Sequence, residues 1–479
     1  MNPNAAMEPR KLLGLGLSYA LILALAIFLE AYFIAAIPLV LLVLYFAFFR
    51  LDVLMLFIVA CTPFSLNLED LELGGIGFYL PTEPLLFGVL LMVLFKVLSG
   101  KFLDEDVLRH PISWLLYTII TWMFLTSITS EIPLVSFKFL LSKLWFIVPV
   151  YFLGTQLLKN QSRIRFFLLS YLFALIIVVL YTILHHASYG FGMEAGHWVM
   201  SPFFKDHTSY GAVLAMFFPV ALGMLFQKNV SALLKVFLLI AFVILCAGII
   251  LSYTRAAWVS IAAAAGLLVL LLFRVKLLTL ISSGLILAAF LFSIQDQLLI
   301  KLERNTQDSS DDLAEHVESI SNVSSDASNL ERLNRWNCAL AMFSERPLMG
   351  WGPGTYQFVY APFQNSQDLT IISTNNADGG NAHSEYLGPL AEQGVAGMLL
   401  MITLVLMVSA LAFRLFYSLE SYELKIVVVS TYLGLVTYFI HGILNNYLDT
   451  DKAAIPFWGF IAILVSIDVV SKSEKAATE

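Results

Sequence analysis

The sequence has few charged residues and few cysteines. Of 479 residues, 27 are Lys or Arg and 34 are Asp or Glu, so 13% are charged, about half the share in a soluble globular chain. This shortage argues against a soluble enzyme, and the net charge of −7 argues against a nucleic-acid-binding protein. The three cysteines, Cys61, Cys246 and Cys338, form no CxxC pair, zinc-site spacing or disulfide framework.

Long apolar runs take the place of charge: 59% of the residues are hydrophobic. The runs are continuous and do not alternate, which favours membrane helices over an outer-membrane barrel. A helix needs about 20 mostly apolar residues to cross a bilayer. We predict an all-α polytopic membrane protein with about 12–14 transmembrane helices. The spans are expected near 12–29, 31–49, 51–64, 84–98, 112–129, 134–154, 164–184, 208–226, 236–253, 256–273, 277–294, 395–413, 426–446 and 454–470.

The distribution of Lys and Arg predicts the orientation. One set of alternate connections, together with both tails, carries 17 of the 27 Lys and Arg residues. Because cytoplasmic loops are enriched in these residues, we expect both termini in the cytoplasm. The chain is expected to divide into N-terminal membrane helices (1–294), an extracytoplasmic loop (295–394), and C-terminal membrane helices with a short cytoplasmic tail (395–479). Arg10 and Lys11 precede the first apolar run without a small-residue cleavage site, which favours an uncleaved first helix.

The loop 295–394 is long enough to suggest a function. Its first third, around 303–329, is rich in Ser, Asp and Asn and is expected to be mobile. A helix capped by Ser328 or Asn329 is expected next, lying at the membrane interface. A Gly- and Pro-rich turn follows at 347–354, and a short helix from Ser384 to about Gln393 is expected to end at Gly394. The interfacial helix has an apolar strip made of Leu330, Leu333, Trp336, Leu340 and Phe343.

Several charged residues stand at the expected outward ends of helices. Arg255 separates two apolar runs, where it acts either as a positional anchor or as a guanidinium that grips phosphate. Lys138 and Lys143 interrupt the sixth span. They point about 140° apart on a helix, so one site cannot easily use both. Each of them either snorkels, pairs with an acid such as Glu131, or contacts substrate.

His383 precedes the short helix that Ser384 is expected to cap. The positive end of that helix favours a neutral imidazole, which suits a general base, although a structural histidine is the alternative. Four more histidines lie within 185–207, at positions 185, 186, 197 and 207, but no metal-binding motif accompanies them. We therefore predict no metal and no cofactor.

Five sequence segments, in this order, resemble the O-antigen ligase and O-antigen polymerase superfamily. The similarity covers roughly residues 200–410 and is strongest in the order and spacing of the segments. Two positions depart from the family pattern: Ser384 stands where Asn is common, and Arg335 is an additional cation. The segments are FFKDHTSYGAVLA from Phe203, TRAAW around Arg255, RLNRW with Arg332 and Arg335, RPLMGWGPGTY from Arg346, and AHSEYLGPLAEQGVAG around His383.

The resemblance implies a GT-C-like, metal-independent, inverting glycosyltransferase in the bacterial inner membrane, with its large loop in the periplasm. It implies a glycan donor on undecaprenyl diphosphate and an acceptor that is either a lipid A core or another glycan. Carried over to this sequence, Arg255 and Arg332 hold the diphosphate and His383 activates the acceptor hydroxyl. Arg335 and Lys138 are further candidates for diphosphate binding.

Ligase and polymerase remain open, because no residue distinguishes their acceptors, although we favour the ligase. A multi-pass solute or glycan transporter is an alternative from another class. Transporters often show two related halves, and the sequence has no such repeat. An assembly partner that has lost activity is a third possibility.

Overall fold

The computed structural model describes residues 18–19, 21–25, 27–28, 37–68, 78–100, 102–228, 230–293, 327–364 and 380–478. It divides into two compact units, 1–57 and 58–479. The first unit contains α2 (Ile37–Phe49) and the start of α3 (Leu51–Cys61). Half of the expected first span (12–29), and the stretch 303–326 that is expected to be mobile, lie outside the described residues.

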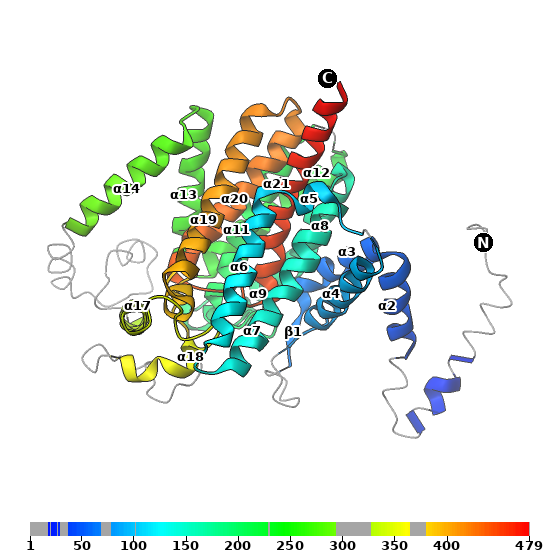
Figure 1. The fold of residues 1–479 in the computed structure, drawn as a ribbon. Helices are drawn as coiled ribbons and strands as arrows, with labels where there is room; N and C mark the ends of the chain where they lie inside the picture. The colour runs from blue at the N-terminus through cyan, green and yellow to red at the C-terminus, as the bar shows by residue number, and fades with distance from the viewer. Residues whose placement is uncertain are drawn as a thin grey trace. The chain divides into compact units, whose positions relative to one another are not determined.

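The described residues confirm an all-α polytopic membrane protein. Nine of their helical segments are long and apolar enough to cross a bilayer. Each agrees with an expected span to within a few residues at most ends, and α9 and α19 are longer (Figure 1). The nine are α6 (Pro111–Ile128), α7 to α8 (Pro133–Leu157), α9 (Gln161–Ser188), α11 (His207–Leu225), α12 (Ala232–Leu251), α13 (Arg255–Leu272), α19 (Leu387–Ser418), α20 (Tyr422–Leu444) and α21 (Asp451–Thr478, with the span at 451–475).

Shorter elements join these spans. The expected third and fourth spans are short helices, α3 with the 3-10 turn η2 (Thr62–Phe64), and α4 (Thr82–Leu98). The expected span at 277–294 is α14 (Leu277–Ser293). Two short strands, β1 (Leu66–Asn67) and β2 (Tyr79–Leu80), pair antiparallel between η2 and α4. The remaining short helices are α5 (Glu105–Leu108), α8 (Gly154–Leu157) and α10 (Met193–Gly196).

One span contains a π-helical segment. Between α7 (Pro133–Phe146) and α8, residues Ile147–Leu153 form the π-helix η3. Pro149 lies inside this segment, and proline removes a backbone donor from the regular helical hydrogen bonds. The span therefore continues through the proline with a local change of helical pitch.

Small residues allow α11 and α20 to pack closely at the centre of the second unit. A Cβ added to Gly434 of α20 would lie 2.5 Å from the carbonyl oxygen of Met216, and one added to Gly223 of α11 would lie 2.7 Å from the Cβ of Ser430. Small residues at such contacts let membrane helices approach without a gap. This packing places the beginning of α11 beside the end of α20, where the candidate site lies.

The loop helix α17 (Ala327–Glu345) is amphipathic, and the side that it buries against the protein is not its apolar strip. The helix already includes Ala327, so the expected caps at Ser328 and Asn329 are wrong. Its buried residues recur at helical spacing, whereas Leu340 of the expected apolar strip is 48% exposed. The buried residues are Glu331, Asn334, Arg335, Cys338, Ala339 and Met342. They pack on α18 (Tyr356–Val359), η4 (Ala361–Phe363) and the start of α19.

The expected short helix and its stop at Gly394 are confirmed. Ser384 accepts hydrogen bonds from the amides of Tyr386 and Leu387, each at 3.2 Å, and the helix begins at Leu387. Gly394 has φ 70° and ψ −169°, which interrupts the helix before the membrane-spanning part of α19 begins. A side chain at Gly394 would meet the carbonyl oxygen of Leu348 at 2.2 Å, so the turn 347–354 packs directly on this break.

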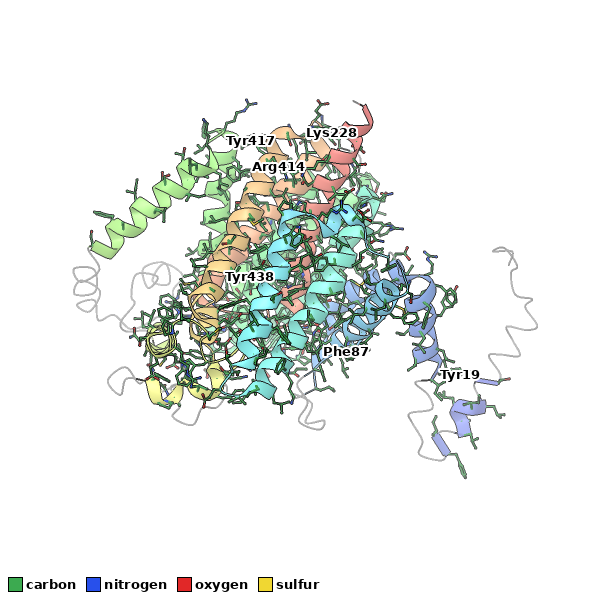
Figure 2. All side chains as sticks on the ribbon, viewed as in Figure 1. Tyr19, Phe87, Lys228, Arg414, Tyr417 and Tyr438 are labelled. Carbon is green, nitrogen blue, oxygen red and sulfur yellow. The ribbon has the colours of Figure 1, made fainter. Side chains whose placement is uncertain are left out.

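Many residues that are expected to be cytoplasmic share the opposite end of these helices. Lys159, Arg414 and Lys472 line one groove there, and Asp468 pairs with Arg414 at 2.9 Å and with Lys472 at 2.8 Å. Figure 2 shows Arg414 and Lys228 at this end, with Tyr438 between it and α17. Because α19 runs from His383 toward Arg414, the candidate site and this cluster lie at opposite ends of the bundle.

Candidate active site

Arg335 is held rigidly on the buried side of α17. Its Nε lies 2.7 Å from the Glu331 carboxylate one turn earlier, and its guanidinium lies 3.9 Å from the ring centre of Tyr360. A Cβ on Gly380 would lie 2.3 Å from Nη1 of Arg335, so only glycine fits at that position. Nη1 is buried and has no hydrogen-bond partner among the described residues. Most of the Arg335 guanidinium therefore contacts other groups of the protein.

Arg332 lies one turn earlier on α17 and is half-buried. Its charge acts on His383, and also on Tyr447 in the connector between α20 and α21 (residues 445–450, here called the α20–α21 connector). The charge of Asp206, at the start of α11, acts on the same two side chains. Arg332 thus lies where three segments that are distant in the sequence meet.

His383 adopts a left-handed backbone conformation, with φ 46°. Such conformations are uncommon outside glycine and persist only where neighbouring groups fix them. The Asn381 side chain accepts a hydrogen bond from the His383 amide at 3.0 Å, and the Trp336 indole donates to its carbonyl oxygen at 3.4 Å. These contacts tie the histidine to α17, the helix that carries both arginines.

The surroundings of His383 keep its imidazole neutral. Burial, followed by the charges of Arg332 and Arg335, lowers the pKa of His383 from 6.5 to about 4. Glu331 and Asp206 act in the opposite direction and are weaker. A neutral imidazole can accept a proton, as a general base must. The sequence-based expectation of a neutral ring is therefore supported, but the cause is burial together with nearby charges.

Arg255 is the first residue of α13, next to the start of α11. The preceding residue, Thr254, donates a hydrogen bond to the carbonyl oxygen of His207 at 2.8 Å. A Cβ on Gly211 would lie 2.7 Å from the Cβ of Thr254, so α11 and α13 touch at this point. The structure thus joins the segments around Phe203–Ala215 and Arg255, which are separated by α12.

Lys138 and Lys143 lie in different environments, as their helical spacing predicts. Lys138 is exposed on α7. Lys143 donates to the carbonyl oxygen of Leu448 at 2.8 Å, and its charge acts on Glu385. The structure therefore brings Lys143, and not Lys138, to the α20–α21 connector.

Glu385 was not identified from the sequence, yet it organises this connector. Its Oε1 accepts hydrogen bonds from the Tyr438 hydroxyl at 2.5 Å, the Tyr447 amide at 2.8 Å and the Leu448 amide at 2.9 Å. Burial raises the pKa of Glu385, while Lys143 and the Tyr438 hydroxyl oppose the rise. The only signal in the sequence is a carboxylate two residues after His383, which does not reveal its partners.

The expected turn at 347–354 is confirmed, and it packs on the first part of α19. The Gly352 amide donates to the Glu392 carbonyl oxygen at 2.7 Å, and the Tyr356 amide donates to the Glu392 carboxylate at 3.0 Å. Arg346 pairs with Glu131 at 2.6 Å. The turn thereby connects α17 to α19 and to the α6–α7 loop.

The loop histidines contact one another and the backbone. The rings of His197 and His207 stack with their centres 4.4 Å apart, and His185 contacts the Val199 carbonyl oxygen at 2.9 Å. Within the described part of the chain, no group of three or more His, Cys, Asp or Glu side chains is arranged to hold a metal ion.

Residues 240–402 match the family model whose description is O-Antigen ligase. The match covers about a third of the chain and supports a relationship to the O-antigen ligase superfamily. A comparison with curated proteins gives no match. The matched range contains Arg255, Arg332, Arg335 and His383, the residues that the sequence analysis singled out. This similarity, found in a multi-pass membrane protein, supports an enzyme of the membrane glycan ligase or polymerase type.

Proposed function

We propose that this protein is a membrane glycosyltransferase that transfers a glycan from undecaprenyl diphosphate to an acceptor hydroxyl on the outer face of the inner membrane. The observation that carries the proposal is the position of a neutral, partly enclosed His383 within the field of Arg332 and Arg335, inside the range that matches the O-antigen ligase family. The arginines supply fixed positive charge, and the imidazole supplies a base. Both are needed for transfer from a lipid diphosphate.

In the proposed reaction, the acceptor oxygen attacks the anomeric carbon of the donor sugar. The new carbon–oxygen bond forms as the bond to the diphosphate oxygen breaks. The acceptor proton passes to His383, which later releases it to solvent or to the diphosphate. Arg255 and Arg332 are assigned to the leaving diphosphate, since fixed cations stabilise the charge that develops there. Attack opposite the leaving group inverts the anomeric centre.

Arg335 is assigned a supporting role. Its ion pair with Glu331 and its contact with Tyr360 hold its guanidinium within the protein. Lys138 is exposed on α7, so its proposed contact with the diphosphate is supported by charge alone.

In the proposed site, His383 becomes a stronger base when the donor binds. Arg332 lowers the pKa of His383 in the free enzyme. A bound diphosphate neutralises that charge, which raises the pKa and makes the imidazole a stronger base. The base is thus most effective when the donor is in place.

A ligase that uses a terminal acceptor such as a lipid A core is favoured, with a polymerase of the same superfamily as the alternative. A deletion strain whose surface polysaccharide is separated on a gel distinguishes them. Loss of all long chains from their final anchor indicates a ligase, whereas a product with a single repeat unit indicates a polymerase. Unchanged polysaccharide would refute both.

Complementation of that strain tests the site. His383→Ala should lower transfer by about 10²–10⁴-fold while the protein remains inserted and binds donor. The matched control is His197→Ala, because His197 is an exposed loop histidine. Near-normal transfer by His383→Ala, or its loss in His197→Ala alone, would overturn the assignment. Reporter fusions at Asp312 and Asp449 should give the periplasmic side, and a cytoplasmic result would refute the proposed location.

A further inference from the structure

A polar cavity of about 210 Å³ lies beside His383, and the mechanism above does not use it. It is enclosed by β1 and β2, the start of α11, the α20–α21 connector and the first turn of α21. The volume far exceeds the roughly 15 Å³ that one water molecule needs, and it is smaller than the roughly 300 Å³ of the smallest drug-sized sites. It therefore suits a ligand of about one sugar ring.

Two residues connect this cavity to the candidate active site. Asn381 lines the cavity and accepts the hydrogen bond from the His383 amide at 3.0 Å. Asp206 lines it as well, and its charge acts on His383. A ligand in the cavity thus lies next to the proposed base.

The charges of the lining favour a neutral ligand. Lys205 and Lys452 are balanced by Asp206 and Asp449, and the lining contains no arginine. A diphosphate carries several negative charges and favours a site with excess cations, preferably arginines. The arginines of this site are elsewhere, on α17 and at the start of α13. The cavity is therefore suited to a ligand rich in hydroxyl groups and poor in charge.

The cavity also presents hydrogen-bonding groups to a ligand. Three asparagines, at positions 67, 381 and 446, line it together with Tyr79 and Tyr447. The Oδ1 atom of Asn446 is buried and has no hydrogen-bond partner among the described residues. A buried amide oxygen without a partner is destabilising, and a sugar hydroxyl would supply the missing donor.

The floor of the cavity is held in place before any ligand arrives. The Lys452 ammonium donates to the Ser65 carbonyl oxygen at 2.8 Å, to the Ser65 hydroxyl at 2.7 Å and to the Thr62 carbonyl oxygen at 3.1 Å. The neighbouring Asp451 accepts from the Ser65 hydroxyl at 2.6 Å and from the Thr82 hydroxyl. Preorganised polar groups bind a ligand without an added ordering cost.

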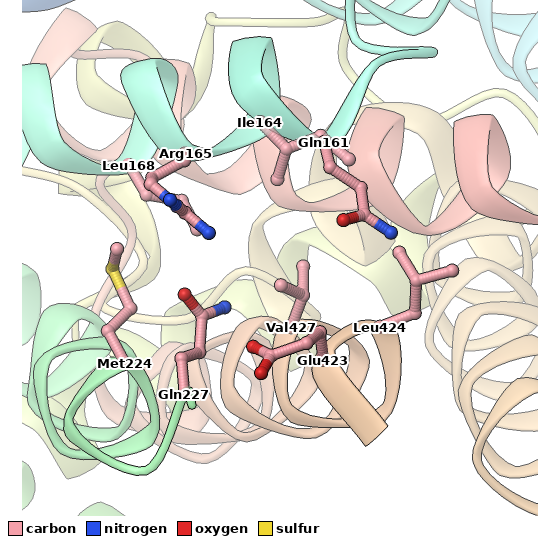
Figure 3. A pocket seen from close by; sticks show the side chains of 9 residues that line it. All are labelled: Gln161, Ile164, Arg165, Leu168, Met224, Gln227, Glu423, Leu424 and Val427. Carbon is pink, nitrogen blue, oxygen red and sulfur yellow. The ribbon is translucent and has the colours of Figure 1, made fainter. Parts of the chain in front are cut away.

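A smaller cavity elsewhere in the bundle lacks these properties. It measures about 20 Å³ and lies at the far end of α9, α11 and α20, between Arg165, Gln227 and Glu423 (Figure 3). It is too small for a sugar and is remote from His383.

We propose that the 210 Å³ cavity binds the sugar residue of the acceptor and presents its hydroxyl to His383. This inference rests on the proposed function, because the acceptor is defined by the transfer reaction. The donor diphosphate and the acceptor sugar then occupy different sides of His383, the arginine side and the cavity side.

Saturation-transfer NMR on the detergent-purified full chain tests binding without requiring turnover. The probes are the methyl glycosides of glucose, galactose, N-acetylglucosamine and heptose. At least one should bind to wild type. Asn446→Ala should weaken binding by about two- to tenfold, the loss expected for one hydrogen bond. Lys205→Ala changes an exposed cavity residue and should also weaken binding. The matched control, Asn337→Ala, lies on the exposed part of α17 and should bind as wild type does.

Inorganic pyrophosphate separates this cavity from the arginine side. It should not displace the bound glycoside, whereas displacement would place the sugar among the arginines and overturn the proposal. Absence of binding by all four glycosides, or equal binding by wild type, Asn446→Ala and Lys205→Ala, would also overturn it. If the proposed function is wrong, the His383→Ala strain should make normal polysaccharide. That result is separate from the binding measurement, which can still be interpreted.

Discussion

The dependence of the transfer rate on pH gives the most direct test of the His383 environment. Burial and the two arginines lower its pKa from 6.5 to about 4, which corresponds to about 3 kcal/mol against the imidazolium form. The base is active when it is neutral. The transfer rate should therefore be maximal above the pKa of His383 and fall below it. An ordinary histidine would lose activity already below neutrality.

The two cases differ strongly between about pH 7.5 and about pH 5.5. With a pKa of about 4, about 97% of His383 is still neutral at the lower pH, so the rate should fall by less than about a tenth. An imidazole with a pKa of 6.5 would be about 9% neutral there, and the rate would fall about tenfold. The quantity to measure is kcat/KM for the donor, because it reports the ionisation of the free enzyme.

Two variants at Arg332 show whether its charge causes the shift. Arg332→Gln removes a positive neighbour of His383. The rate should therefore fall overall, and the acidic limb of the pH–rate profile, the range in which the rate drops as the pH is lowered, should move toward pH 6.5. Arg332→Lys keeps the charge and should keep the limb near its original position, although its rate falls because an ammonium cannot reproduce the guanidinium fork. This account of His383 would be refuted if the acidic limb of the wild-type profile were centred near pH 6.5. It would also be refuted if the limb did not move in Arg332→Gln.

Three further predictions concern stability and metal dependence. Glu385→Ala leaves the Tyr447 and Leu448 amides without their acceptor and should lower the free energy of unfolding by about 2 kcal/mol or more. Glu385→Gln should lower it by less. Equal unfolding temperatures for the two variants would contradict the role of this carboxylate. Gly352→Ala places a Cβ 2.0 Å from the Ser130 hydroxyl at φ 112°, which should cost about 2 kcal/mol or more in thermal unfolding, whereas Gly88→Ala, with open space around it, should not destabilise. EDTA should not change the transfer rate, and loss of activity that added divalent metal restores would instead favour the loop histidines.

Composition and local spacing were enough to predict the membrane class, most of the spans and the local stops. These features depend on composition and on residues close in the chain, as with the apolar runs that became α9 and α20 or the break at Gly394. The sequence also singled out Arg332, Arg335 and His383, since these lie in short segments that resemble a known superfamily. Their electrostatic coupling was implied by that resemblance and not by spacing.

Which side of α17 is buried depends on the surface against which the helix packs. Helical periodicity identifies the apolar strip, but a helix at a membrane interface can direct that strip toward lipid and bury its polar side against protein. Arg335 and Glu331 are buried for this reason, while Leu340 is exposed. The periodicity contains no information on the surface of α18 and α19 that receives the helix.

The roles of Glu385, Lys143 and the cavity at Asn446 likewise depend on tertiary packing. Glu385 and Leu448 are 63 residues apart, and Lys143 and Leu448 are 305 apart. Asn67, Asp206 and Asn446 come together in one cavity only because α11, α20 and α21 pack around it. Contacts between such distant residues depend on how helices pack in three dimensions, which neither hydropathy nor local spacing encodes.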